Sequence, residues 1–384
     1  MSQSHTLKIG LLFSTVGETA LLESSQLRGA LQAIDELNRK GGVGGRELVP
    51  VQYEPESNAE KFRALAECLL TQDNVNVIFG GYTSTSRKAM LPIVEKYNRL
   101  LFYPQQYEGF EFSEHIVYGG SAPNQNGVQL ADYLTSQFGA RVYMVGSRYV
   151  YPYECNRNMQ ELILQYPGGA IVGERYLDLA GSYADFELVI NDIKKKRPDF
   201  IFSTVIGATV PFLYQAYTRA GLDPEKMPIG SLNTSETEIA MMGIQAGCGH
   251  ITSAPYFQSV GTPENAAALQ VFRQRYGDAI TTDMNWEAAY YQIYLYAMAF
   301  EIAGSDEFNR IIPELRGREF IAPQGRIQIN AVNQHTGLNP RIGRANEHGQ
   351  FTILRESRRM VPPDPYMATQ AAGDWVTKLT AAER

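Results

Sequence analysis

Signals for strands and helices alternate along the chain at intervals of about 25–30 residues, and this alternation restricts the fold more than any other feature. The first round runs from the apolar segment LKIGLLFS through VNVIFGGY to LLFYP, with amphipathic helical segments between them. Because adjacent parallel strands need a crossover connection, the pattern predicts βαβ units in a parallel sheet. A second round of similar length, from NQNGVQLADYLTSQFG to MPIGSLN, predicts a second unit of the same kind.

Three extended segments connect or follow these rounds, namely IVYGGSAPNQN, HITSAPYFQ and FIAPQGRIQINAVNQH. A chain that passes between two lobes and back needs such crossings, so each segment is predicted to be a hinge. We therefore predict an α/β fold of two doubly wound parallel-sheet lobes, joined by three hinge crossings, with a ligand cleft between them. The predicted N-terminal lobe comprises 1–121 plus 254–328, and the predicted C-terminal lobe comprises 122–253 plus 329–384.

Composition and charge argue against several classes of function. The 384 residues include 34 Lys plus Arg and 41 Asp plus Glu, and the net charge of −7 comes without a basic block, so direct nucleic-acid binding is not expected. No apolar run approaches the ~18 residues of a membrane span. The start MSQSHTLKIG lacks the apolar core of a secretory signal, so a cytoplasmic protein is expected.

Catalytic and metal-binding motifs are likewise absent from the sequence. It contains no HExxH pair, no G-x-S-x-G elbow and no phosphate-binding P-loop, and the glycines of GGVGG at 41–45 follow a predicted helix, where they are expected to form a turn. The cysteines Cys68, Cys155 and Cys248 are too widely spaced for a metal motif. We therefore predict a protein that is not an enzyme and that has no metal and no cofactor.

Neutral polar side chains gather at the carboxyl ends of four predicted strands, two in each lobe, where α/β proteins usually bind ligands. The segments are GGYTSTS, YPQQYE, GSRYVYPY and GSLNTSE. Their hydroxyls, amides and aromatic rings suit a small uncharged ligand, although helix capping and core packing would also explain them. The candidate ligand-binding residues in these segments are Ser84, Thr85 or Ser86 at the first strand end, Tyr103, Pro104 and Gln105 at the second, Tyr149 and Tyr151 at the third, and Asn233, Thr234 or Ser235 at the fourth.

The ligand is expected to be uncharged. A buried amino-acid ligand would bring an ammonium group that needs a carboxylate partner, and the two candidates are Glu108 and Glu236. Both lie a few residues beyond the strand ends, where we interpret Glu236 as a residue of a first helical turn and Glu108 as a rim or structural residue. Tyr107 and Tyr153 also lie farther from the strand ends and are interpreted as structural. A small amide or urea is therefore favoured over an amino acid.

Several segments together resemble a known family. YTSTSRKAMLPIVE, YPQQYEGFE, HIVYGGSAPNQN, SRYVYPYECN and the tail PPDPYMATQAAGDW are similar to the AmiC-like cytoplasmic amide sensors, and the similarity extends over essentially the whole chain. This family has the type I periplasmic-binding-protein fold and is related to the urea and leucine receptors of ABC transporters. The resemblance implies that a short amide such as acetamide binds between the lobes. It also implies regulation of amidase expression by sequestering an RNA-binding antiterminator protein. The ligand positions that it implies are Tyr82, Ser84, Tyr103, Tyr149 and Thr234, with Tyr151 and Pro104 lining the cleft, and of these only Tyr82 lies outside the candidates above.

One residue departs from the family pattern. Those sensors carry a threonine two residues after the tyrosine of the fourth strand, where this chain has Gln105, and YPQQYEG is more similar to urea receptors. Urea is therefore an expected ligand beside acetamide. The alternative function is the substrate-binding receptor of an ABC transporter for urea, a short amide or a branched-chain amino acid, and an amidohydrolase is a further alternative. Assembly into a homo-oligomer is left open.

Overall fold

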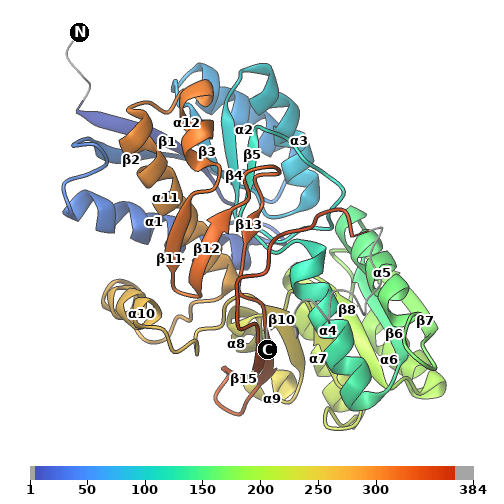
Figure 1. Ribbon diagram of the computed structural model, residues 1–384. Helices are drawn as coiled ribbons and strands as arrows, with labels where there is room; N and C mark the ends of the chain where they lie inside the picture. The colour runs from blue at the N-terminus through green and yellow to red at the C-terminus, as the bar shows by residue number, and fades with distance from the viewer. Residues whose placement is uncertain (1–4, 368–384) are drawn as a thin grey trace.

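The computed structural model describes residues 5–367, which form two α/β lobes. Figure 1 shows the blue and orange N-terminal lobe above the green and yellow C-terminal lobe. The chain passes from the first lobe to the second after β5 (Ile116–Tyr118), returns after β10 (Ile251–Ala254) and joins the second lobe again at β14 (Arg341–Ala345). Among the described residues, no helix has both the length and the apolar character that a membrane crossing needs.

A five-stranded parallel sheet in the order β2-β1-β3-β4-β5 forms the centre of the N-terminal lobe. Its other strands are β1 (Thr6–Leu12), β2 (Glu47–Tyr53), β3 (Val77–Gly80) and β4 (Leu100–Tyr103). The helices associated with this lobe are α1 (Ala20–Arg39), α2 (Ala59–Thr71), α3 (Ser84–Lys96), α10 (Pro263–Tyr276), α11 (Met284–Ala303) and α12 (Phe308–Leu315). Because side chains alternate along a strand, Phe102 packs with α1 and α11 on one face, whereas Leu101 packs with α2 and α3 on the other.

A seven-stranded sheet in the order β15-β14-β10-β9-β8-β6-β7 forms the C-terminal lobe. Strands β6 to β10 are parallel, and β14 and β15 extend the sheet in antiparallel fashion. The other strands are β6 (Arg141–Ser147), β7 (Ala170–Leu177), β8 (Phe200–Thr204), β9 (Ile229–Ser231) and β15 (Phe351–Glu356). The helices are α4 (Pro123–Phe138), α5 (Val150–Ile163), α6 (Tyr183–Lys196), the 3₁₀ turn η1 (Gly207–Thr209), α7 (Val210–Arg219), α8 (Glu236–Met242) and α9 (Ile244–Gly247). The predicted α/β fold with two parallel-sheet lobes is confirmed.

The third predicted hinge crossing folds differently from the prediction, because it forms an antiparallel hairpin within a small three-stranded sheet instead of one extended segment. The strands of this sheet are β11 (Glu319–Ala322), β12 (Gly325–Ile329) and β13 (Thr336–Gly337). Pro323 lies in the turn, and Gly325 takes a φ of +111°, which residues with a side chain rarely adopt. The predicted boundary between 328 and 329 therefore lies inside this sheet. The final part of the predicted C-terminal lobe, 368–384, lies outside the described residues.

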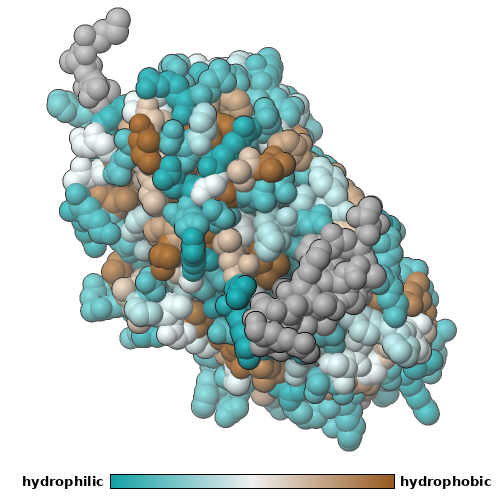
Figure 2. All heavy atoms as spheres, viewed as in Figure 1, coloured by the Kyte–Doolittle hydropathy of each residue, from teal (hydrophilic) through white to brown (hydrophobic). Residues whose placement is uncertain are grey.

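Apolar side chains are concentrated in the interiors of the two lobes. On the face seen in Figure 2, hydrophobic residues are scattered in small groups among polar ones. The largest fully buried side chains include Trp286, Arg87 and Tyr103. Of these three, Arg87 alone carries a full charge into the interior, and it does so in the first turn of α3, where the sequence predicts the ligand site.

Helix α1 packs closely against α11, and a glycine permits the contact. A Cβ atom on Gly29 would lie 2.1 Å from the backbone oxygen of Trp286. Trp286 is fully buried, and its Nε1 donates to Oε1 of Gln32 in α1 at 3.3 Å. The hydroxyl of Ser25, also in α1, donates to Oδ1 of Asp283 at 2.7 Å. Close backbone packing and buried hydrogen bonds therefore join the two helices.

Substitution of Gly29 should test this packing. Gly29→Ala places a methyl group against the backbone of α11, so we expect the free energy of unfolding to fall by about 1–3 kcal/mol. The matched control is Gly127→Ala in α4, where a Cβ would meet no described atom within 4 Å. Because alanine favours the helix over glycine, the control should keep or gain about 0.5–1 kcal/mol. Urea unfolding of both variants measures the difference, and equal stability of the two would contradict the packing argument.

Candidate ligand-binding site

Phenol side chains from both lobes meet where the carboxyl ends of the strands face each other. Tyr82 follows β3 in the first lobe, whereas Tyr149 and Tyr151 lie at the start of α5 in the second. Tyr82 and Tyr151 belong to one buried cluster, and Tyr149 packs against it. The rings of Tyr149 and Tyr151 are stacked, with centroids 6.2 Å apart. The fold therefore brings three of the predicted ligand-binding residues together from separate lobes.

The hydroxyl groups of these phenols differ in whether they are already hydrogen-bonded. Tyr151 donates to Oδ1 of Asn233 at 2.6 Å, and Tyr103 donates to the backbone oxygen of Tyr82 at 2.6 Å. The hydroxyls of Tyr82 and Tyr149, in contrast, have no hydrogen-bond partner within residues 5–367. Burial raises the pKa of both phenols well above the usual value, so they remain neutral donors. A ligand carbonyl between the lobes could accept from either group.

Ser84 lies in the first turn of α3 but does not cap the helix. The cap is Thr83, whose Oγ1 accepts from the backbone nitrogen of Ser86 at 3.1 Å. The Ser84 hydroxyl instead donates to Oε2 of Glu108 and accepts from Nη1 of Arg87 at 3.3 Å. Ser84 is therefore at the predicted strand end, and its hydrogen is already used by a carboxylate of the same lobe.

Arg87 is the centre of a buried ion-pair network at this strand end. Its guanidinium lies 3.0 Å from Oε1 of Glu108 and 2.6 Å from Oε1 of Glu111. The same group lies over the rings of Tyr103 and Tyr107, at 5.0 and 4.7 Å from their centroids. Two carboxylates and two aromatic faces thus compensate the buried charge. The sequence pattern did not single out Arg87, although the i, i+3 spacing from Ser84 places both on one face of α3.

Gln106 connects the two lobes directly. Its Nε2 donates to the backbone oxygen of Leu232 at 2.6 Å, to the hydroxyl of Tyr151 at 3.2 Å and to Oδ1 of Asn233. Its Oε1 accepts from Nδ2 of Asn126 at 2.9 Å. The prediction chose the neighbouring glutamine, so it missed this residue. The duplicated amide in YPQQYEG was the available signal, but a sequence does not say which of two adjacent side chains crosses to the other lobe.

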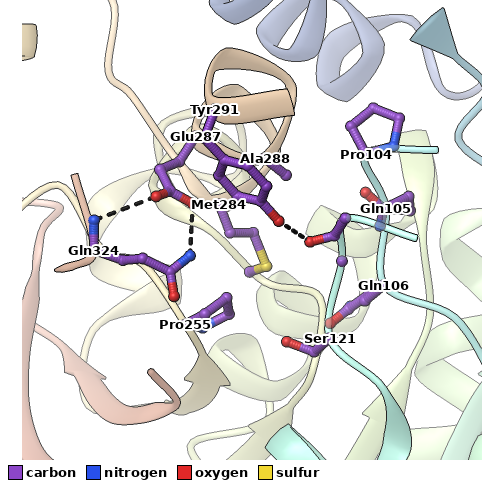
Figure 3. A pocket seen from close by; sticks show the side chains of 12 residues that line it. Pro104, Gln105, Gln106, Ser121, Pro255, Met284, Glu287, Ala288, Tyr291 and Gln324 are labelled. Carbon is purple, nitrogen blue, oxygen red and sulfur yellow. Dashed lines mark hydrogen bonds between the residues drawn. The ribbon is translucent and has the colours of Figure 1, made fainter. Parts of the chain in front are cut away.

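Pro104 and Gln105 line a separate small cavity beside the hinge segments, shown in Figure 3. Oε1 of Gln105 accepts from Nε2 of Gln26 at 3.2 Å. Across the cavity, Glu287 accepts from the backbone nitrogen and Nε2 of Gln324 at 3.2 and 2.9 Å. None of the predicted phenols lines this cavity. The structure thus places Pro104 and Gln105 at the hinge side of the predicted site.

Thr234 lies beside the residues that cross between the lobes, but its own contacts stay within the second lobe. Its hydroxyl shares a hydrogen bond of 2.8 Å with the hydroxyl of Tyr214. Its backbone nitrogen donates to Oγ of Ser231 at 3.1 Å. The preceding residue, Asn233, makes the contact with Tyr151, and its Nδ2 is buried without a partner in the described part of the chain. Asn233 is therefore a further candidate, which the resemblance to the sensor family did not single out.

A group of buried carboxyls lies at the start of α8. Glu236 accepts from the backbone nitrogen of Gln258 at 2.7 Å, and Glu238 accepts from that of Ser235 at 2.7 Å. The Ser235 hydroxyl also donates to Oδ2 of Asp283 across the lobe boundary at 3.2 Å. Burial raises the pKa of Glu236 and of Glu238 from 4.5 to about 8. Both are mostly protonated near neutral pH, so they are poor partners for a ligand ammonium group.

Comparison with known proteins places the chain in a family. The family model described as periplasmic binding protein domain matches residues 7–372. The chain belongs to the periplasmic binding protein family. The two facing strand-end surfaces described above are thus the inter-lobe surfaces of a periplasmic binding protein.

Relatives of this periplasmic binding protein include one similar over most of its length. The leucine-, isoleucine-, valine-, threonine- and alanine-binding protein of Pseudomonas aeruginosa is 22% identical, over 84% of this chain and 86% of that protein. A limonene hydroxylase of Geobacillus stearothermophilus is 32% identical, but the match covers 33% of this chain and 23% of that protein. This chain therefore spans less than a quarter of the length of that relative.

Solved structures share the fold of this periplasmic binding protein. A solute binding protein of an ABC transporter from Rhodopseudomonas palustris, in complex with p-hydroxybenzoic acid, has a TM-score of 0.85 and 22% identity, covering 95% of this chain and 100% of that one. The branched-chain amino acid transporter substrate binding protein LivJ of Streptococcus pneumoniae, in complex with isoleucine, has a TM-score of 0.81 and 20% identity, covering 93% and 100%.

The buried carboxyls make stability depend on pH. The folded state holds Glu236 and Glu238 at a pKa of about 8, above the ordinary 4.5, so it binds more protons than the unfolded chain in that window. Their favourable contribution is complete below pH 4.5 and is lost as the pH rises through about 8. In Glu238→Gln, which cannot ionise, the free energy of unfolding should therefore fall less steeply across this window than in the unaltered protein.

Urea unfolding at several pH values within this window measures that slope. The control is Glu187→Gln on the exposed face of α6. It removes an exposed carboxyl instead of a buried one, so the slope should equal that of the unaltered protein. An identical slope in Glu238→Gln and in the control would show that Glu238 does not take up a proton on folding.

Proposed function

We propose that this protein is a receptor without catalytic activity that binds a small uncharged amide, or urea, between its two lobes. The observation that carries the proposal is the pair of phenol hydroxyls, Tyr82 from the first lobe and Tyr149 from the second, that lack a partner among the described residues. Their hydrogens are therefore free to be donated to an acceptor that the described residues do not supply. The carbonyl oxygen of an amide or urea has two lone pairs and can accept from both.

The surrounding charges support an uncharged ligand. The positive charge of Arg87 is already paired with Glu108 and Glu111, so it is not free to hold a ligand carboxylate. Glu236 and Glu238 carry raised pKa values, so they do not offer an ionised partner to an ammonium group near neutral pH. An amino acid would bring both of these charges into the site, and each costs several kcal/mol if it stays unpaired.

Ligand binding would act by holding the lobes together. A ligand that bonds to Tyr82 and to Tyr149 at once has contacts from both lobes only when the lobes are closed. It therefore binds the closed form more tightly and shifts the population toward it. Gln106 and Asp283 already form hydrogen bonds across the boundary, so closure adds protein–protein contacts to those of the ligand. The closed form then presents a changed surface to whatever partner reads the ligand state.

Two roles use such a receptor, and different observations support each. Family membership, together with the names of the similar solved structures, supports delivery of the ligand to an ABC transporter. The resemblance of YPQQYEGFE, HIVYGGSAPNQN and the DPY…DW tail to AmiC-like sensors supports a cytoplasmic role, in which the protein sequesters an RNA-binding antiterminator and so regulates amidase expression. Of that tail, the part beyond residue 367 lies outside the described residues. Family membership makes transport the first candidate and amide sensing the second.

Removal of single hydroxyls should weaken binding without disturbing the fold. Tyr82→Phe and Tyr149→Phe keep the ring and lose one hydrogen bond to the ligand, so each should weaken binding by roughly 5–30-fold, about 1–2 kcal/mol. Isothermal titration with acetamide, urea and leucine measures this, after the purified protein is unfolded and refolded to remove carried-over ligand. Tyr153→Phe is the control, because Tyr153 lies one turn further along α5 and is exposed.

Each outcome of that titration bears on one claim. Unchanged affinity in both phenylalanine variants would reject the site, and binding of leucine in place of acetamide and urea would reject the ligand class. The roles are separated by fractionation of cells that produce the native chain with its own N-terminus. Recovery with exported proteins assigns transport, whereas recovery in the cytoplasm, bound to an RNA-binding protein that acetamide or urea releases, assigns sensing.

A further inference from the structure

A carboxylate of the protein itself stands at the start of α3, beside the predicted ligand site. Glu108 is 2% exposed, lies 3.0 Å from the guanidinium of Arg87 and accepts a hydrogen bond from the hydroxyl of Ser84. Its backbone oxygen accepts from Nδ2 of Asn158 in the second lobe at 3.3 Å, so Glu108 lies at the lobe boundary. Helix N-termini attract anions through their free amide groups and the helix dipole. Here the carboxylate of Glu108 lies beside that end of the helix, held by the side chains of Ser84 and Arg87.

The hydrogen bond to Glu108 determines what Ser84 can offer a ligand. A hydroxyl has one hydrogen to donate and two lone pairs that accept. The hydrogen is committed to Glu108, and one lone pair accepts from Arg87. Only an acceptor lone pair remains. Ser84 can therefore receive a hydrogen bond from a ligand N–H group, but it cannot donate one to a ligand oxygen.

The negative charge of Glu108 also reaches the phenols. Burial first, and the electrostatic effects of Tyr103 and Glu108 after it, raise the pKa of Tyr149, so Glu108 and the phenol from the second lobe lie within electrostatic range. A ligand carboxylate in the same space would be repelled by Glu108 and would meet the lone pair of Ser84 with no hydrogen of its own. A primary amide or urea has the same shape and size but presents N–H groups on that side.

We propose that Glu108 is a specificity-determining residue, which rejects carboxylate ligands and makes Ser84 an acceptor that selects an N–H donor. The inference rests on the proposed function, because it concerns the same inter-lobe site. It assigns complementary roles to two sets of groups. The free hydroxyls of Tyr82 and Tyr149 receive the ligand carbonyl, and the pair of Ser84 and Glu108 selects the –NH₂ group.

The first test uses the unaltered protein and three compounds of nearly equal size. Acetamide has a carbonyl and an –NH₂ group, methyl acetate has a carbonyl without any N–H, and acetate is an anion at neutral pH. Isothermal titration should give binding of acetamide, with acetate and methyl acetate at least about 10-fold weaker, because a buried acceptor left without its donor is costly. Tight binding of methyl acetate or of acetate would overturn the inference.

Variants then locate the selection at Glu108. Glu108→Gln keeps the size of the side chain and the acceptor for Ser84 but removes the charge, so acetate should bind at least about 10-fold more tightly than to the unaltered protein. Ser84→Ala keeps the charge, so it should weaken acetamide by roughly 5–30-fold while acetate stays excluded. The matched control is Glu111→Gln, which removes the other carboxylate of Arg87, lies outside the contact with Ser84 and should leave the preference for acetamide unchanged.

The outcomes separate this inference from the proposed function. If the unaltered protein binds acetamide but Glu108→Gln still excludes acetate, the role of Glu108 is wrong and the amide receptor stands. If the unaltered protein binds neither acetamide nor urea, the proposed function is wrong and the inference falls with it. Circular dichroism establishes that each variant is folded. Should Glu108→Gln not fold, because Arg87 loses a buried partner, the methyl acetate comparison and Ser84→Ala still decide the question.

Discussion

Polar groups enclosed between the two lobes must find partners, and the arrangement of the site follows from how this requirement is met. The amide of Gln106 reaches across to Leu232 and Asn233, and Asp283 receives hydroxyls from Ser25 in its own lobe and from Ser235 in the other. The bonds from Gln106 and from Ser235 cross the lobe boundary, so they hold the two lobes together in this arrangement. A polar group without a protein partner in this region is free to bond to water or to a ligand. The hydroxyls of Tyr82 and Tyr149 are such groups within the described residues.

The charged side chains in the same region are paired with one another. Arg87 is fully buried, yet it does not create a free positive site, because Glu108 and Glu111 take up its hydrogen bonds and aromatic rings cover its faces. An arginine with an unused charge at this strand end would favour an anionic ligand. The network thus places two carboxylates of the protein beside the first turn of α3, where they pair with its guanidinium. The same interaction also holds the loop after β4 against α3.

The fold and part of the candidate site could be predicted from the sequence, because both depend on local patterns of residues. Alternating apolar runs and amphipathic segments predict two parallel-sheet units, and the strand ends of such units carry the ligand contacts in either lobe. Tyr103, Tyr149 and Tyr151 could be chosen on that basis, whereas Tyr82 came only from resemblance to a family. The hairpin of β11 and β12 was missed because the same β-forming residues suit an extended crossing, and only the pairing of the two strands distinguishes the two structures.

The sequence by itself determined that this chain forms two parallel-sheet lobes and that neutral hydroxyls and amides gather at the strand ends, because the periods of strands and helices and the place where each strand stops are properties of neighbouring residues. Tertiary structure decided the rest. It turned Gln105 toward Gln26 and sent Gln106 across to the other lobe, and it gave the hydrogen of Ser84 to Glu108. These choices depend on partners more than 20 residues away in the chain, since a hydrogen bond needs a donor and an acceptor at about 3 Å. Only the packed lobes bring such groups to that distance.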